Sequence, residues 1–247
     1  MNKTALLGVA CFLALWYCVS GLGLVNPVLF PMPHVVAIKM AELVYTGRAI
    51  SDVVGTVYRT AIGFAAAAII GIGLGLVTGY LKSVYGALNF LIDFFRSIPA
   101  TALFPMFMLF VGIGDLAKVS VVIFSCGLIN MVHAAYGVRN ARQSRILAAR
   151  SMRATKWQTF GKVIFPEAMP HVFAGLRTTL SLSLVLVVVM EMFIGTQAGL
   201  GQRIYEAHLM FRIPEMYATI GIAGILGYLM NKGFVLCERK LVHWAGK

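Results

Sequence analysis

Four charged residues lie within or beside the most apolar stretches of the chain, where charge is costly. Asp93 and Arg96 stand three residues apart, so on a helix they share one face and could form an ion pair. Arg177 and Glu191 bracket the uncharged run Thr178–Met190. Charged groups inside a membrane bundle are candidates for a solute pathway or its gate. The competing interpretation is structural: Asp93 pairs with Arg96, and Glu191 forms a salt bridge with another helix.

No group of residues has the spacing of a catalytic or metal site. A membrane-embedded enzyme would need clustered His, Asp or Glu, and the acids here are isolated. The four cysteines lie in or at the ends of apolar stretches without paired metal spacing, and the five histidines are scattered singly. We therefore predict no catalytic residue, no metal ligand and no cofactor in this chain.

The segment from Arg139 to Pro166 is basic, rich in alanine and prone to form helix. It holds seven of the 21 lysines and arginines, and Glu167 is the nearest acid. On one continuous helix its five arginines would form a basic face. The seven basic residues are Arg139, Arg142, Arg145, Arg150, Arg153, Lys156 and Lys162. In a membrane protein, this excess of positive charge places the segment in the cytoplasm.

Local signals divide the same segment into two short helices with a turn near Ala154. Thr155 and Gln158 have the spacing of a capping box, so Thr155 could begin the second helix. That helix is predicted to end at about Phe165, because Pro166 disfavours helix at the residue before it, although a proline can also open the next helix.

Two aromatic side chains on the second helix, Trp157 and Phe160, need another surface to pack against. They lie three residues apart and therefore share a helix face. Composition leaves open whether the protein's own helix ends, the lipid interface or a soluble partner covers them.

The elements that carry these residues are membrane helices. Hydrophobic residues make up 60% of the chain and charged residues only 12%, which a soluble protein of this size could not bury. A membrane span needs about 20 apolar residues, and six regions can supply that length. Their uncharged runs are at about Thr4–Ala37, Ala61–Leu81, Ser97–Gly114, Val119–Val138, Thr178–Met190 and Met216–Asn231. The fold class is therefore all-α, a polytopic bundle of about six transmembrane helices.

The distribution of lysine and arginine predicts that both termini are cytoplasmic. With the N-terminus inside, 13 basic residues face the cytoplasm and five face the outside. The net charge of +12 then needs no nucleic acid, because a basic inner face lies against anionic lipid headgroups. Alternatively, the first apolar stretch is a cleaved signal peptide, which would leave five crossings with the termini on opposite sides.

One span carries small residues at every fourth position. This stripe lets another helix approach the backbone closely, and its glycines lack the spacing of a dinucleotide-binding loop. Its members are Gly63, Ala67, Gly71, Gly75 and Gly79.

The region Ser83–Gly114 is about 32 residues long, which is too long for one straight crossing. Pro99 and Pro105 are the predicted breaks, because each proline removes a backbone donor and clashes with the preceding turn.

The basic segment resembles the coupling-loop signature of the permease subunits of bacterial ABC importers. The resemblance rests on Ala148–Phe160, then Val163–Pro166 and Ala174–Arg177. It extends over roughly Pro27–Trp244. Further similar stretches, typical of the branch that imports nitrate, sulfonates, taurine or bicarbonate, are Arg96–Pro99, Val111–Lys118, Val188–Met192 and Gly199–Gly201. The chain departs from the signature at Leu147, Arg153 and Phe165, where the family prefers Glu, Gly and Leu.

The resemblance implies a single transmembrane permease domain, residues 1–247, with the fold of a type I importer and a coupling loop at about residues 139–170. Its implied partners are a dimer of ABC ATPase subunits, a second permease copy, an extracytoplasmic binding protein and the lipid bilayer of the inner membrane. ATP and Mg would be bound by the partner ATPase, because the chain has no Gly-x-x-x-x-Gly-Lys-Ser/Thr loop. The implied cargo is a small anion.

The implied site residues form two groups. Expected to dock the ATPase are Ala148, Ala149, Arg150, Arg153, Ala154, Thr155, Trp157 and Pro166. Expected in the pathway or its gates are Asp93, Arg96, Arg177 and Glu191. The alternative function is a channel or secondary transporter that works without an ATPase, and such transporters often show internal repeats.

Overall fold

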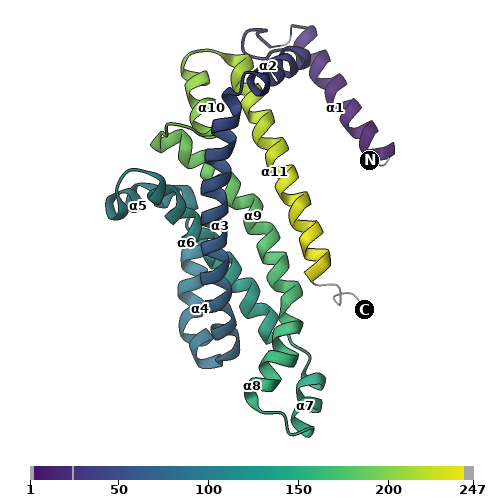
Figure 1. Cartoon of the computed structure of the whole chain (residues 1–247), viewed down its shortest axis with the longest axis vertical. Helices are drawn as coiled ribbons and strands as arrows, with labels where there is room; N and C mark the ends of the chain where they lie inside the picture. The colour runs from purple at the N-terminus through teal and green to yellow at the C-terminus, as the bar shows by residue number, and fades with distance from the viewer. Residues whose placement is uncertain (1–2, 24, 242–247) are drawn as a thin grey trace. The chain divides into compact units, whose positions relative to one another are not determined.

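The computed structural model describes residues 3–23 and 25–241, and every regular element in these ranges is helical. The all-α prediction is therefore confirmed. Figure 1 shows the order of the elements along the chain. They are α1 (Lys3–Gly21), α2 (Pro33–Tyr45), α3 (Arg48–Tyr80), α4 (Lys82–Ser97), η1 (Ala100–Leu103), α5 (Phe104–Val111), α6 (Asp115–Arg139), α7 (Gln143–Ser151), α8 (Lys156–Thr159), η2 (Phe160–Ile164), α9 (Phe165–Ile194), α10 (Leu200–Leu209) and α11 (Ile213–Leu241).

Five of the described helical stretches are long and apolar enough to cross a membrane, and a bent pair of helices gives a sixth. The prediction of about six crossings is confirmed in this sense. The straight candidates are Thr4–Gly21, Arg48–Tyr80, Asp115–Arg139, Lys156–Ile194 and Ile213–Lys240. The two chain ends, which the sequence places in the cytoplasm, lie outside the described residues.

The bent pair interrupts the long region predicted to contain two proline breaks. Its halves, Ser83–Ser97 and Ala100–Val111, meet at 91°, and Pro99 lies in the break. Pro105 does not break the helix, so that half of the prediction is wrong. It occupies the first turn of α5, where a missing N–H leaves no helical hydrogen bond unmade.

The chain divides into two compact units, which we describe separately. Unit 1 comprises Met1–Thr56 and Glu191–Leu226, and unit 2 comprises Val57–Met190 and Gly227–Lys247. The core of unit 1 joins α2 to the start of α11 through buried residues that include Leu43, Leu200 and Ala218. Trp16 of α1 packs against this core and donates a hydrogen bond of 3.1 Å from Nε1 to the carbonyl of Pro31.

In unit 2, the stripe of small residues on α3 lies against α6. A Cβ added to Gly63 would stand 2.8 Å from Cγ1 of Val122, and one added to Gly79 would stand 2.8 Å from Cα of Ala135. At Gly71 and Gly75 an added Cβ would collide with backbone carbonyl oxygens of α6. The two backbones therefore lie in close contact, and only glycine fits at these four positions of the stripe.

Helix α9 packs against α6 by a similar close approach. Gly137 faces the backbone of Ala168, and Gly175 faces the ring of His133. A buried hydrogen bond of 3.0 Å from the hydroxyl of Thr179 to Oδ1 of Asn130 adds a polar contact between the helices. Helix α6 is thus the centre of unit 2 and fixes the end from which the basic segment leaves.

Candidate functional site: a basic elbow and the charged clusters

The basic segment folds as an elbow, a name we use for residues 139–170. Helix α7 is followed by a turn at residues 152–155 and then by α8, as the sequence predicts. In Figure 1, α7 and α8 project together at the lower end of unit 2, where α6 leads in and α9 leads out.

A capping box fixes the turn of the elbow. The backbone N–H of Gln158 donates to Oγ1 of Thr155 at 3.3 Å, and Oε1 of Gln158 accepts from the backbone N–H of Thr155 at 2.9 Å. The prediction made from the Thr155–Gln158 spacing is confirmed. Two N–H groups that would otherwise lack partners are satisfied reciprocally, so the start of α8 is well defined.

The helical path of the elbow continues past Phe165, and Pro166 opens α9, which is the second of the two outcomes that the sequence left open. The π-helical turn η2 connects α8 to α9, and Pro166 lies in the first turn of α9. The N–H of Phe165 bonds to the carbonyl of Phe160, five residues back. This wider turn changes the hydrogen-bond pairing just before Pro166, which has no N–H to donate. The helix therefore continues in the same direction through the proline.

Glu167 and a small apolar cluster hold the inner face of the elbow. The Glu167 carboxylate accepts hydrogen bonds from the backbone N–H of Arg142 and, at 2.8 Å, from Nη1 of Arg145. Ile146 of α7 and Ile164 of η2 are buried with residues of α6 and α9. Because charge-assisted hydrogen bonds and apolar packing act together here, the elbow and α9 form one rigid piece.

The outer face of the elbow is exposed. Trp157 and Met152 are 85% and 83% exposed, whereas Phe160 is half-buried and stacks edge-on against Tyr80 with ring centroids 5.3 Å apart. The protein's own α3 thus covers one of the two aromatic side chains. The tryptophan is left on the surface.

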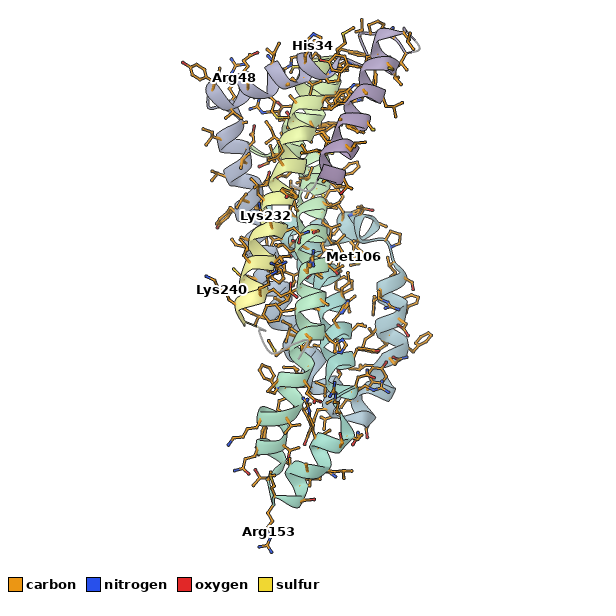
Figure 2. All side chains as sticks on the ribbon, turned by 90° about the vertical axis from the view of Figure 1, so that its right-hand side faces the viewer. His34, Arg48, Met106, Arg153, Lys232 and Lys240 are labelled. Atoms are coloured by element: carbon orange, nitrogen blue, oxygen red, sulfur yellow. The ribbon has the colours of Figure 1, made fainter. Side chains whose placement is uncertain are left out.

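Arg153 lies at the tip of the elbow, and Figure 2 shows its side chain pointing away from the ribbon. Its φ angle of 57° is in the left-handed region, which favours glycine. The family preference for Gly at this position therefore has a backbone cause: the turn itself requires a positive φ. Arg153 adopts that conformation in spite of its side chain.

The five arginines of the segment do not form one continuous basic face, because the segment is not one continuous helix. Arg139 ends α6, Arg142 precedes α7, and Arg153 lies in the turn, because the chain changes direction twice between them. Of the other docking candidates, Ala148, Ala149 and Arg150 lie on α7, Ala154 and Thr155 in the turn, and Trp157 on α8.

Two of the four predicted pathway residues pair with each other in unit 2. Nη2 of Arg96 donates to Oδ1 of Asp93 at 3.1 Å, and both side chains are about half exposed. Asn89 donates to the other carboxylate oxygen of Asp93 at 3.3 Å. Arg177 lies exposed on α9. The Asp93–Arg96 contact matches the structural interpretation of this pair.

Glu191 is completely buried in unit 1, at the first turn of α10. Its Oε2 accepts from the backbone N–H of Gly201 at 3.0 Å, and the hydroxyl of Thr56 donates to both carboxylate oxygens at 3.0 and 2.9 Å. The same Thr56 oxygen accepts from the N–H of Leu200, and Asp52 accepts from the N–H of Gly199, each at 3.0 Å. We call Asp52, Thr56 and Glu191 the α10 cap.

The α10 cap continues into a chain of ion pairs within unit 1. Arg203 binds Asp52 through Nε and Glu215 through Nη1, and Arg212 binds the other oxygen of Glu215 at 3.1 Å. Burial lowers the pKa of Arg203, but its hydrogen bonds and charge interactions with Asp52 and Glu215 outweigh this and raise it above the ordinary value. The guanidinium therefore stays charged at any physiological pH.

Sequence reasoning missed most of the α10 cap and its ion pairs. Asp52 and Thr56 are four residues apart and so share a helix face, which was the available signal. Their partners lie far along the chain, from 135 residues away for Thr56 and Glu191 to 151 for Asp52 and Arg203, and no local pattern links them. The Gly199–Gly201 stretch is now explained, because a Cβ at Gly199 would lie 2.6 Å from the Glu191 carboxyl carbon.

A second cluster, in unit 2, joins α3 to α6. Nε of Arg59 donates to Oδ1 of Asp115 at 2.7 Å, and Nζ of Lys118 donates to the same oxygen at 3.1 Å. Arg59 and Lys118 are buried, whereas Asp115 is about half exposed. The charge count assigns Lys118 to the extracytoplasmic side of the membrane, and within unit 2 its side chain is 1% exposed.

A bundle of about six membrane-crossing helices with a rigid basic elbow defines a multi-pass membrane protein of the transporter type. Residues 67–233 match the family model described as "Binding-protein-dependent transport system inner membrane component". The matched residues are more than half of the chain. The protein therefore belongs to this family of importer permeases, and it is a transport component, a permease subunit of an ABC importer in the inner membrane.

Relatives and solved structures agree with this assignment. The putative aliphatic sulfonates transport permease protein SsuC of Bacillus subtilis is 28% identical, over 95% of this chain and 85% of its own length. The taurine transport system permease protein TauC of Escherichia coli is 27% identical, over 97% and 88%. The nitrate import permease protein NrtB of Synechocystis is 30% identical, over 74% and 66%.

The fold matches that of other ABC importer permeases. An inward-facing structure of the MetNI methionine ABC transporter has a TM-score of 0.68 and 22% identity, and it covers 78% of this chain and 95% of the solved chain. An amino acid ABC transporter crystallised with histidines has the same TM-score, with 20% identity and coverage of 81% and 97%. The predicted fold of a type I importer permease is confirmed.

Proposed function

We propose that this permease forms the membrane pathway of an ATP-driven importer for a small organic anion, with an aliphatic sulfonate as the first substrate to test. A binding protein would deliver the anion on the outer side, and two permease copies would enclose the pathway. The whole chain, residues 1–247, would act as one permease domain. Support comes from relatives whose names specify aliphatic sulfonates, taurine and nitrate.

The single observation that carries the proposal is the two-sided construction of the elbow. Its inner face is fastened by Glu167 and buried isoleucines, while its outer face exposes Trp157 and Met152. A large aromatic group on a rigid surface is the kind of anchor that protein interfaces use. We infer that an ATPase subunit covers this outer face, with Ala148, Ala149, Arg150, Arg153, Ala154, Thr155, Trp157 and Pro166 at or next to the contact.

The elbow can transmit force because α8, η2 and α9 form one helical stretch, Lys156–Ile194. A displacement of the elbow by the closing ATPase would therefore move α9 along its whole length. The pathway would then switch between outward and inward openings, provided that nucleotide binds one arrangement more tightly than the other. Asp93, Arg96, Arg177 and Glu191 remain candidates for gates along it.

ATP and Mg would be bound by the partner ATPase. In this chain, the pair that most resembles part of a phosphate-binding motif is Gly161-Lys162, and it lies inside the π-helical turn η2. A phosphate-binding loop needs a flexible glycine-rich backbone before a helix N-terminus. The excess of basic residues supports a cytoplasmic elbow and cytoplasmic termini.

The test is ATP-driven uptake of labelled sulfonate by proteoliposomes that contain permease, ATPase and binding protein. Trp157→Ala and Arg153→Glu are expected to abolish uptake and to release the ATPase during purification, without changing membrane insertion. Tyr45→Ala removes an equally exposed aromatic ring, 93% exposed, from unit 1 and should retain the ATPase. Uptake without an ATPase would instead establish a channel or a secondary transporter.

A further inference from the structure

A cavity of about 430 Å³ lies between α4 and α6 in unit 2. Its wall has an apolar part and a polar part. Ile92, Met131, Val132 and Ala135 give it an apolar wall, and three of these four side chains are buried. Polar groups, which include Arg139, line the rest. A ligand that fills such a cavity has an alkyl body and a polar head.

The polar end of the cavity carries one unmatched positive charge. Arg139 lies over the ring of Tyr85, with its guanidinium carbon 3.9 Å from the ring centroid. Within the part of the chain that the structure describes, its guanidinium forms no hydrogen bond or ion pair. The ring contact occupies none of the guanidinium N–H groups in a described hydrogen bond, so they are available to an oxyanion, which a guanidinium binds in a bidentate manner.

The acid in the cavity does not cancel this charge. Asp93 is matched by Arg96 at 3.1 Å, and its second oxygen accepts from Asn89 at 3.3 Å. With that pair neutral, the cavity presents a net positive charge at Arg139. It therefore favours a monoanion over a cation or a neutral molecule.

We propose that the α4–α6 cavity binds an alkanesulfonate, with the sulfonate on the N–H edge of Arg139 and the alkyl chain on the wall around Ile92 and Met131. The inference rests on the proposed function, because it assumes that organic anions pass through this permease. Nitrate and bicarbonate carry no alkyl body and would leave the apolar wall uncovered. The cavity therefore selects the sulfonate class among the cargoes named for the relatives.

The position of the cavity also gives it a role. Arg139 is the last residue of α6, and the elbow begins directly after it. On the proposed topology this is the cytoplasmic end of the pathway. An anion held here would be bound by the residue through which α6 joins the elbow, so release of cargo and movement of the elbow would be linked.

The test measures binding of 1-butanesulfonate to the complete permease–ATPase complex in nanodiscs, without the binding protein. Arg139→Gln should weaken binding at least tenfold, since it removes a charge-assisted contact, and Arg139→Lys should retain part of the affinity. Lys240→Gln, which removes an exposed cation on α11, should bind as the wild type does. Thermal unfolding of each variant checks that the fold is intact.

A series of sulfonates tests the apolar wall without any mutation. From methanesulfonate to butanesulfonate, affinity should rise about fourfold for each methylene that the wall covers. Nitrate should displace butanesulfonate only weakly.

Affinity that is independent of alkyl length, equal binding by Arg139→Gln and Lys240→Gln, or no binding at millimolar concentration would each overturn the cavity assignment. ATP-driven uptake by the wild type distinguishes the two levels of the proposal. If uptake persists while the cavity assignment fails, only this inference falls. If no anion is taken up with ATP, the proposed function falls as well.

Discussion

The elbow and the α10 cap both concentrate charge, but they use it in opposite ways. In the α10 cap, the buried carboxylates accept hydrogen bonds from the backbone N–H groups of Gly199 and Gly201, and Thr56 donates to Glu191. Arg203 joins the network through Asp52. In the elbow, the arginines and Trp157 are mostly exposed, and one carboxylate, Glu167, fastens the inner face. A closed network defines a local structure, whereas an open set of cations and an aromatic anchor is available to another molecule.

The difference corrects a simple rule for reading membrane proteins. Glu191 is a charge in an apolar span, and on that ground it is a candidate for a gate. Its contacts show a carboxylate that satisfies the start of a short helix, where negative charge also interacts favourably with the helix dipole. The gate hypothesis therefore requires that opening breaks this cap, which is a stronger and more testable claim.

The largest effect is expected from removing the buried carboxylate. Glu191→Ala should lower the free energy of unfolding by about 1–3 kcal/mol for each buried donor that loses its acceptor, and Thr56 and the N–H of Gly201 are two such donors. The measurement is denaturant unfolding in detergent. Glu42→Ala is the matched control, since Glu42 is exposed and pairs only with Lys39 on its own helix in the contacts described.

The control should change stability by no more than about 0.5 kcal/mol. If Glu191→Ala and Glu42→Ala behaved alike, the contrast between closed and open charge would fail. Glu191→Gln adds a further distinction, because it keeps the shape and loses the charge. Normal stability with lost transport in this variant would favour the gate interpretation.

A smaller effect on stability, with a large effect on coupling, is expected from Glu167→Ala. The change removes two hydrogen bonds to Arg142 and Arg145, and a hydrogen bond to a charged group contributes about 1.5–3 kcal/mol. Helix α7 would then be free to move relative to α9. ATP hydrolysis by the assembled transporter should continue while uptake falls, which a comparison of both rates in proteoliposomes would reveal.

The matched control for Glu167 is Glu206→Ala, which removes an exposed carboxylate from α10 whose described contact is with Gln202 on the same helix. Its uptake per ATP hydrolysed should equal that of the wild type. Uptake and hydrolysis that fall together in Glu167→Ala would contradict the role of the inner face as a fastening.

Loss of the capping box should have a more modest effect. Thr155→Ala is expected to cost about 1 kcal/mol, because the first N–H groups of α8 lose an acceptor. Thr178→Ala is the control, since in the described part of the chain its hydroxyl donates to one carbonyl of its own helix, that of Ala174. Thermal unfolding should separate the two variants, and equal midpoints would show that the cap adds nothing to the elbow.

The extent to which the sequence predicts this molecule follows the range of the interactions. The capping box and the turn near Ala154 depend on residues within a few positions of each other, and both were predicted. The α10 cap joins Asp52 and Thr56 to residues far along the chain, so its geometry had no local signature. The continuation of helix through Pro166 was only the second of the two expectations for this proline, because it depends on the π-helical turn that precedes it.

The smallest expected effect, and the only stabilising one, concerns the tip of the elbow. Arg153→Gly removes a side chain from a residue with φ of 57°, which should stabilise the turn by up to about 1 kcal/mol. The family signature carries Gly at this position, so the variant should still dock the ATPase and support uptake. Arg153→Glu keeps the strained backbone and reverses the charge, so it should lose both. Comparison of the two variants separates the shape of the turn from its charge: a lower unfolding temperature for Arg153→Gly would show that the arginine side chain stabilises the elbow, and equal uptake by both would show that the charge at the tip is irrelevant to docking.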